Sequence, residues 1–211
     1  MPSPLARMYR EALRAAEHLR PSVWPRARRF EIAYAILVND EVHQFVNRMQ
    51  TDVVRTCRVR PLLHETPHIT LKLGFRVSAF EPFEAYLETL ARETDPFEIG
   101  VRDVGFFDEG IIFLDVEPNA AFERLRHRIL RDLSERHGIE PYAIEGDQFH
   151  PHVTVAFGLS SHDVEHAKAV FGGAGARFHF MLEALGLLCQ TSTQWVTRKR
   201  ANLTGSPAKP S

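Results

Sequence analysis

The chain has 211 residues, 44% of them hydrophobic and 25% charged, with a formal net charge of −1. This composition allows a sizeable core, and the near-neutral charge argues against a strongly basic, general nucleic-acid binder. No segment approaches the run of about 20 apolar residues that spans a bilayer. Cys57 and Cys189 lie far apart, without metal or redox spacing. We therefore expect one cytoplasmic domain with reduced thiols and no membrane insertion.

The first half of the chain predicts a strand, a helix, a strand, a helix and a strand, after an N-terminal helical extension over residues 1–29. Apolar residues at helical spacing indicate the helices, and runs of β-favouring residues indicate the strands. The expected elements are a strand over 30–38, a helix from Asn39 or Asp40 to about 56, a strand over 66–75, a helix over 81–94 and a strand over 97–107.

The same order then begins again, after a hairpin turn signal at Asp108-Glu109-Gly110. The second series is a strand over 111–117, a helix from Asn119 to about 137, a strand over 149–158, a helix over 161–171 and a closing hairpin of 177–189 with 194–199. We expect a disordered tail over 202–211.

Matching sequence offsets support a duplication. His68 and His152 are 84 residues apart, and Gly105 and Gly186, in similar apolar strands, are 81 apart. A long unit present twice indicates two lobes related by a pseudo-two-fold axis. We therefore predict an α/β (α+β) fold of duplicated β-α-β-α-β-β units, with lobes at roughly 30–109 and 110–201.

The two most similar stretches carry the candidate chemistry. Thr66 to Phe75 and Phe149 to Gly158 each contain Pro-His-x-Thr followed by apolar residues and a glycine. Successive side chains of a strand point to opposite faces, so the histidine and the threonine of each motif share one face. A two-fold arrangement would bring two imidazoles and two hydroxyls around one point.

That set of groups suits a phosphodiester. Near neutral pH one imidazole can accept a proton from the attacking hydroxyl or water while the other protonates the leaving oxygen. Threonine hydroxyls and backbone amides can bind the non-bridging oxygens. The chemistry requires no metal ion, no cofactor is expected, and the sequence leaves open which histidine is the base.

With these motifs the chain, over about residues 30–200, resembles the two-histidine (2H) phosphoesterase superfamily, which includes the LigT-like 2'-5' RNA ligases and RNA 2',3'-cyclic phosphodiesterases. The resemblance implies a bilobal fold with antiparallel sheets lining a central cleft. It implies that His68 and His152 are the acid and base and that Thr70 and Thr154 bind phosphate. The implied partners are RNA ends or nucleotide 2',3'-cyclic phosphates, with ligation as the reverse reaction, and a monomer is expected.

Further candidates surround the motifs. Lys72 would share the His68 and Thr70 face and bind phosphate or form a salt bridge at the rim, whereas Ala156 holds the matching position. Phe75 and Phe157 follow the motifs and could stack on a base, although core packing is the favoured reading. The loops before the motifs supply candidates for substrate recognition: Arg58, Arg60, Tyr142 and Phe149.

Two other functions fit part of the pattern. The cleft could belong to a non-catalytic module that binds a nucleotide or RNA end. His150-Pro151-His152-Val153-Thr154 also resembles the alternating histidines of the histidine-triad nucleotide hydrolases, but the third histidine is replaced by threonine. A His-x-His pair without a carboxylate or cysteine pattern does not define a metal site. We therefore expect His150 to support the site rather than to react.

Overall fold

The computed structural model describes residues 29–57, 66–107, 110–146, 149–191 and 194–204. The N-terminal helical extension, the loop containing Arg58 and Arg60, and the tail beyond Thr204 lie outside these residues. The disordered tail was expected from residue 202, but Asn202 ends a strand and the Leu203 amide binds the Glu183 carbonyl at 2.8 Å. The elements are β1 (Phe30–Leu37), α2 (Asp40–Cys57), β2 (His68–Val77), α3 (Glu81–Arg92), β3 (Glu98–Phe107), β4 (Ile111–Val116), α4 (Ala120–His137), η1 (Ala143–Glu145), β5 (His152–Ala156), α5 (Ser161–Phe171), β6 (Arg177–Met181), β7 (Ala184–Gln190) and β8 (Trp195–Asn202).

The expected helix starts are confirmed by their caps. Asn39 Oδ1 accepts a hydrogen bond from the Val42 amide at 3.1 Å before α2. Asn119 Oδ1 accepts from the amides of Ala121 and Phe122 before α4. Each side chain satisfies amides that have no partner within the helix, which fixes the first turn.

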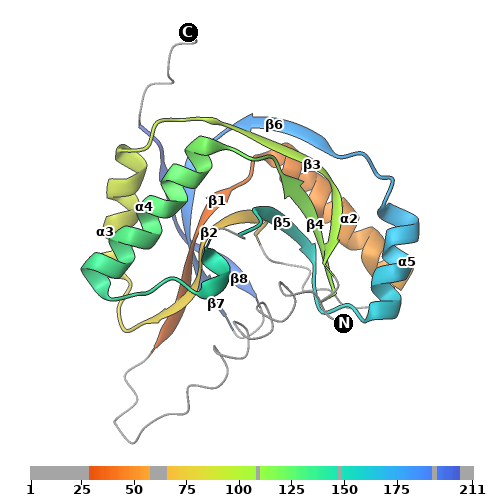
Figure 1. Ribbon diagram of the computed structural model, residues 1–211, viewed down its shortest axis with the longest axis horizontal. Coiled ribbons are helices and arrows are strands. Elements are labelled where there is room, and N and C mark those ends of the chain that lie inside the picture. The colour runs from red at the N-terminus through yellow and green to blue at the C-terminus, as the bar shows by residue number, and fades with distance from the viewer. Residues whose placement is uncertain (1–28, 58–65, 108–109, 147–148, 192–193, 205–211) are drawn as a thin grey trace, which may run out of the picture.

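The fold is mixed α+β, with one curled antiparallel sheet in the order β6-β3-β4-β5-β2-β1-β7-β8 (Figure 1). The expected antiparallel pairing is confirmed. The two sheets that we expected are the two halves of a single sheet. They join where β2 pairs with β5 through Ile69 and Val153. Both motif strands therefore lie side by side at the centre.

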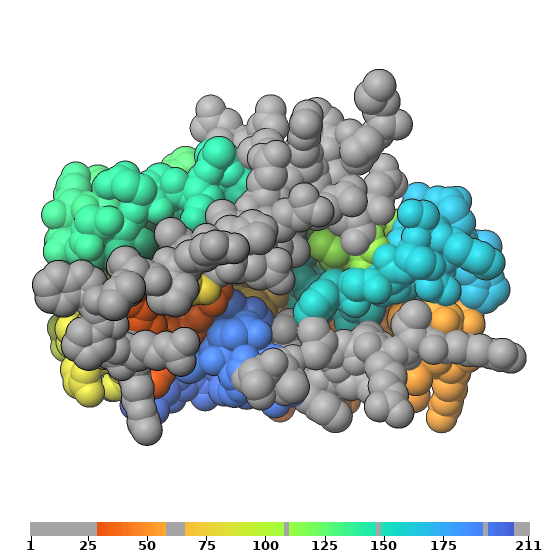
Figure 2. Space-filling model, turned by 90° about the horizontal axis from the view of Figure 1, so that it is seen from below, coloured from red at the N-terminus to blue at the C-terminus, as the bar shows by residue number. Residues whose placement is uncertain are grey.

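The two sequence repeats exchange elements within this sheet. β3 of the first repeat pairs with β4 of the second, and β7 of the second pairs with β1 of the first. Helix α2 packs on β5 and α4 packs on β2, so the helices cross over as well. Figures 1 and 2 show α3 and α4 at one end of the molecule and α2 and α5 at the other. The predicted boundary at 109/110 separates the repeats in the sequence but does not divide the sheet.

The expectation of one strand over 177–189 is wrong, because Leu182 and Glu183 divide it into β6 and β7 at opposite sides of the sheet. Six strand spacings of about 4.8 Å would place β6 about 29 Å from β7 in a flat sheet. The link from Met181 to Ala184 spans at most about 11 Å. The sheet must therefore curl, and the Leu182 amide binds the Phe97 carbonyl at 2.8 Å at the turning point.

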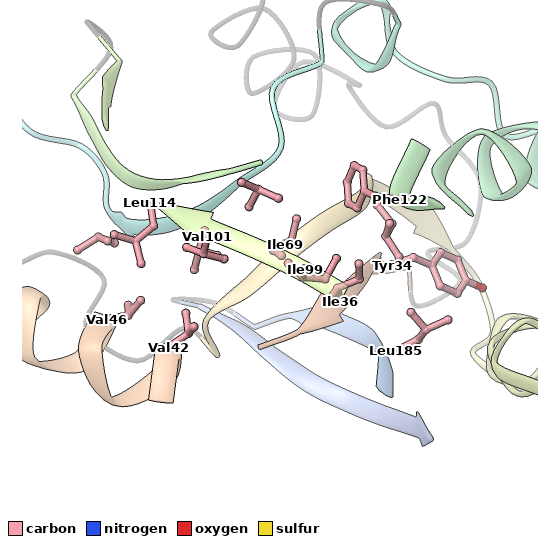
Figure 3. Close-up of a cluster of buried hydrophobic side chains, with 14 of the residues drawn as sticks. Tyr34, Ile36, Val42, Val46, Ile69, Ile99, Val101, Leu114, Phe122 and Leu185 are labelled. Atoms are coloured by element: carbon pink, nitrogen blue, oxygen red, sulfur yellow. The ribbon is translucent and has the colours of Figure 1, made fainter. Parts of the chain in front are cut away.

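The core lies on the face of the sheet that the four described α-helices cover. It runs continuously from Val42 and Val46 of α2, past Ile69 and Leu114 at the centre, to Phe122 of α4 (Figure 3). Burial of apolar surface from both repeats in one cluster fixes the two halves of the sheet against each other. No helix in the described part of the chain is long and apolar enough to cross a membrane.

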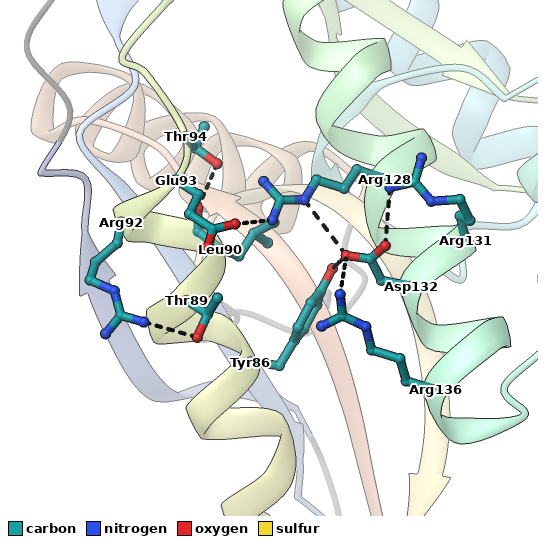
Figure 4. Close-up of polar contacts among 10 residues, drawn as sticks. All are labelled: Tyr86, Thr89, Leu90, Arg92, Glu93, Thr94, Arg128, Arg131, Asp132 and Arg136. Carbon is teal, nitrogen blue, oxygen red and sulfur yellow. Dashed lines mark hydrogen bonds and ion pairs between the residues drawn. The ribbon is translucent and has the colours of Figure 1, made fainter.

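A polar cluster joins α3 to α4 beside this core (Figure 4). The Tyr86 hydroxyl donates to Asp132 Oδ2 at 3.0 Å, and Arg128, Arg131 and Arg136 lie within 4.0 Å of the same carboxylate. Asp132 is almost fully buried, so these partners compensate its desolvation. The cluster holds two helices of different repeats together.

Candidate active site

The register of the two central strands gathers the motif side chains on one face. Ile69 pairs with Val153, and both are fully buried on the helix-covered face. Alternation along each strand then directs His68, Thr70, His152 and Thr154 to the opposite face. In an antiparallel pair the neighbours of Ile69 lie beside those of Val153 in reverse order, so each histidine lies beside the other strand's threonine.

Both imidazoles are oriented in the same way by the main chain. His68 Nδ1 lies 2.7 Å from the Thr66 carbonyl oxygen, and His152 Nδ1 lies 2.8 Å from the His150 carbonyl oxygen. A carbonyl oxygen can only accept, so these contacts assign the proton of each neutral ring to Nδ1. Nε2 is left as the nitrogen that can take up or give a proton in a reaction.

The electrostatic surroundings favour neutral rings. The pKa of His152 is lowered to about 4, chiefly by burial; positive charge on His150 and His68 also lowers it, while the hydrogen bond to the His150 carbonyl and the charge of Asp115 act against the shift. Burial also lowers the pKa of His68, against its hydrogen bond to the Thr66 carbonyl. Desolvation disfavours the charged imidazolium in both cases.

The strands next to the two motif strands, β1 beside β2 and β4 beside β5, carry different residues at equivalent positions. Ala35 pairs with Thr70 on one side and with Gly186 on the other. Phe113 pairs with Thr154 and with Gly105. The two glycines therefore hold equivalent places, as their sequence offset predicted. A Cβ atom on Gly105 would lie 2.2 Å from Phe113 Cζ, so this glycine makes room for the ring.

Aromatic rings surround the second histidine. Phe107 and Phe113 stack with their centroids 4.1 Å apart, and each centroid lies 5.4 Å from that of His152. The first half has Ala35 where the second has Phe113, and Leu37 opposite His68 where the second has Asp115 opposite His152. His152 thus has an aromatic and a charged residue on the neighbouring strand, where His68 has alanine and leucine.

Lys72 does not lie where alternation placed it. The register shifts on both sides of its pair with Tyr34, a fully buried residue of the core face, and this irregularity turns Lys72 away from the His68 face. Lys72 is itself fully buried, with Nζ 2.7 Å from Glu145 Oε2. The predicted salt bridge is therefore present but buried, and a phosphate contact would require this pair to open.

Glu145 organises the connection before the second motif. Its carboxylate accepts from the Leu73 amide at 2.6 Å and the Tyr142 amide at 2.8 Å, besides Lys72. Arg126, almost fully buried, donates to the Glu145 carbonyl at 2.6 Å. These bonds fasten the segment around η1 to β2, just after the first motif.

The remaining candidates are divided between core and surface. Phe75 is buried against Tyr34 and Phe83, which confirms the packing reading. Tyr142 is half-buried and donates to the Gly74 carbonyl, and Phe157 is 37% exposed. Phe149 lies under the Arg126 guanidinium, 4.5 Å from its carbon atom. Arg58 and Arg60 lie outside the described residues.

Sequence reasoning missed Asp115, Phe113, Glu145 and Arg126. Asp115 had a usable signal, since it is the one charged residue in the apolar run from Ile111 to Val116. The others lie in ordinary helix, strand or loop contexts. Across the described ranges, no group of three or more His, Cys, Asp or Glu side chains could hold a metal ion.

A curled antiparallel sheet with paired His-x-Thr strands at its centre is the architecture of the two-histidine phosphoesterases. The chain belongs to the 2'-5' RNA ligase superfamily, whose sequence profile matches residues 38–193. A comparison with curated protein sequences gave no significant match.

Solved structures share the fold at low sequence identity. TT0787 of Thermus thermophilus is 22% identical with a TM-score of 0.60, and the match covers 83% of this chain and 99% of that one. E. coli LigT in apo form is 19% identical with a TM-score of 0.61, covering 84% and 99%. A phosphoesterase is 18% identical with a TM-score of 0.63, covering 83% and 98%.

Proposed function

We propose that the protein is a metal-independent phosphodiesterase that opens RNA-type 2',3'-cyclic phosphates or cleaves 2'-5' linkages. The observation that carries the proposal is the Ile69–Val153 register, which puts two imidazoles and two hydroxyls on one face. Nucleotides are the favoured substrate class because E. coli LigT, which shares the fold, forms crystalline complexes with 3'-AMP and with ATP.

In the proposed reaction one imidazole Nε2 takes a proton from water as the oxygen attacks phosphorus. The bond from phosphorus to one ribose oxygen breaks, and the other imidazole gives that oxygen its proton. With water the product is a phosphate monoester; with a ribose 5'-hydroxyl in place of water, the same ring opening breaks the bond to the 3'-oxygen and forms a 2'-5' linkage, which is ligation and is the reverse of 2'-5' cleavage to a cyclic phosphate. Thr70 and Thr154 donate to the non-bridging oxygens, where negative charge builds up.

The lowered pKa values of both histidines bear on where the proton for the leaving oxygen comes from. Both rings favour the neutral form in the unliganded protein, so the acid must gain its proton with the substrate. A bound phosphodiester anion favours a protonated ring beside it. The protonated ring then serves as the acid and the neutral ring as the base, and His68 and His152 are equivalent candidates for either role.

The test is a product-resolved assay with 2',3'-cyclic and 2'-5' substrates in EDTA. His68→Ala and His152→Ala should each lower the rate by ~10²-fold or more. His179→Ala, an exposed histidine of β6, is the control and should keep the full rate. Full activity in either motif variant would refute the assignment.

The same measurements test the alternatives. Nucleotide affinity without turnover would indicate a binding module, and a trapped phosphohistidine would indicate histidine-triad chemistry. We further propose that the protein acts as a monomer in the cytoplasm, which gel filtration with light scattering and cell fractionation would test.

A further inference from the structure

The two motif histidines differ in the residue that supplies the carbonyl oxygen to which each ring donates. His68 donates to the carbonyl of Thr66, and His152 donates to the carbonyl of His150. The residue two positions before the second motif histidine therefore carries a second imidazole. The equivalent position in the first motif holds the hydroxyl side chain of Thr66 instead.

The His150 side chain has neighbours on two sides. Its Nε2 lies 2.9 Å from Asp115 Oδ1, within the distance of an ion pair for a protonated ring, although the two atoms form no hydrogen bond. Its ring meets Phe107 and Phe113 edge to face, with centroids 5.5 and 5.3 Å away. These two aromatic rings are the ones that flank His152.

Asp115 is fixed to the sheet next to the reacting group. It lies opposite His152 in the pairing of β4 with β5, and its Oδ2 lies 3.5 Å from Arg102 Nε on β3. Beside it, the Val116 amide binds the Pro151 carbonyl at 3.3 Å, which ties the segment between the two histidines to β4. The segment that carries the orienting carbonyl thus meets β4 through the main chain of Pro151 and the side chain of His150.

We propose that His150 and Asp115 are positioning residues for His152. Asp115 holds the His150 ring, and the anchored His150 presents its carbonyl to His152 Nδ1, which keeps the proton there and leaves Nε2 as the reacting nitrogen. This role rests on the proposed function for its catalytic consequence, because orientation of a ring that transfers a proton matters most in the reaction step. Neither residue has to touch the substrate.

The titratable and aromatic groups described around His152 all enter the test. They are His68 from β2, Asp115 from β4, Phe107 and Phe113, and His150 itself, with Arg102 behind Asp115; Thr70 of β2 also lies beside His152. A substitution at His150 changes one of these groups and the position of the carbonyl. A tautomer measurement separates the two effects from a general loss of folding.

The experiment combines kinetics with ¹⁵N NMR of the histidine rings in the full chain. His150→Ala and Asp115→Ala should each lower kcat by ~10-fold or more, with KM within about twofold. The double variant should be no slower than the slower single variant, because residues that act as one unit are not additive. His150→Gln keeps a polar side chain beside Asp115 and should recover most of kcat.

The NMR spectrum supplies a readout that does not depend on turnover. At pH 7 His152 should be the Nδ1–H tautomer in the unaltered protein and a mixture in His150→Ala, while His68, held by Thr66, should not change. An unchanged His152 tautomer together with unchanged kcat in His150→Ala would overturn the positioning role. Absence of turnover in the unaltered protein would instead refute the proposed function, and the tautomer would still decide the role of His150. If His150→Ala does not fold, Asp115→Asn carries the same two measurements.

Discussion

The buried Lys72–Glu145 pair gives the sharpest prediction about stability. Both side chains are essentially inaccessible to solvent, and Nζ lies 2.7 Å from Oε2. Lys72→Met removes the cation. Of the described hydrogen bonds to the Glu145 carboxylate, those from the backbone amides of Leu73 and Tyr142 remain. Removing one partner of a buried pair costs about 3–5 kcal/mol. The two remaining amide donors place our expectation near ~3 kcal/mol.

Urea unfolding followed by circular dichroism measures this loss. A loss of ~3 kcal/mol corresponds to a fall in Tm of roughly 6–12 °C for a chain of this size. The double variant Lys72→Met/Glu145→Gln should recover part of it, because no buried charge remains. Lys199→Met, which breaks an ion pair at the surface, is the matched control and should leave the midpoint nearly unchanged. A Lys72→Met protein within about 0.5 kcal/mol of the unaltered chain would refute the reasoning.

Three further measurements test the packing and the charge of the site. Gly105→Ala should cost about 1–3 kcal/mol in urea unfolding and lower activity, because the new methyl group displaces Phe113; unchanged stability would contradict the tight contact. Tyr34→Phe removes a buried 2.9 Å bond to the Phe83 carbonyl and should cost about 1 kcal/mol, measured in the same way. The lowered pKa of His152 means that the unfolded chain takes up its proton first as the pH falls. The free energy of unfolding is therefore highest above about pH 6.5 and falls towards about pH 4, by about 3 kcal/mol on account of His152. The His152→Gln variant lacks this group and should lose about 3 kcal/mol less than the unaltered chain over the same range. Parallel curves of unfolding free energy against pH would contradict the prediction.

The parts of the fold that depend on local chemistry could be predicted from the sequence. The caps Asn39 and Asn119 act within one helical turn, so their residue type is sufficient to place α2 and α4. The shared face of His68 and Thr70 follows from the period of a strand, which requires no knowledge of its neighbours. The match of Gly105 with Gly186 could be recognised in the sequence because each glycine makes room for a side chain of the neighbouring strand, Phe113 and Leu37 respectively.

The parts that depend on distant pairing could not be predicted in this way. Lys72 follows a shift in register that the partner strand imposes, and alternation alone places it on the wrong face. The break at Leu182 and Glu183 arises because the two pieces find partners towards opposite ends of the sheet, β6 on β3 and β7 on β1. The pairing of His150 with Asp115 joins residues 35 positions apart, and neither side chain signals the other.

The exchange of β3 and β7 between repeats has a consequence for dissecting the molecule. A chain cut between β3 and β4 gives one fragment in which β3 has lost both of its partners and another in which β7 has lost β1. Each fragment also carries one motif and the helix that covers the motif strand of the other. The duplication is therefore visible in the sequence but does not yield two independent folding units, and the two fragments should be able to rebuild the sheet only by complementing each other.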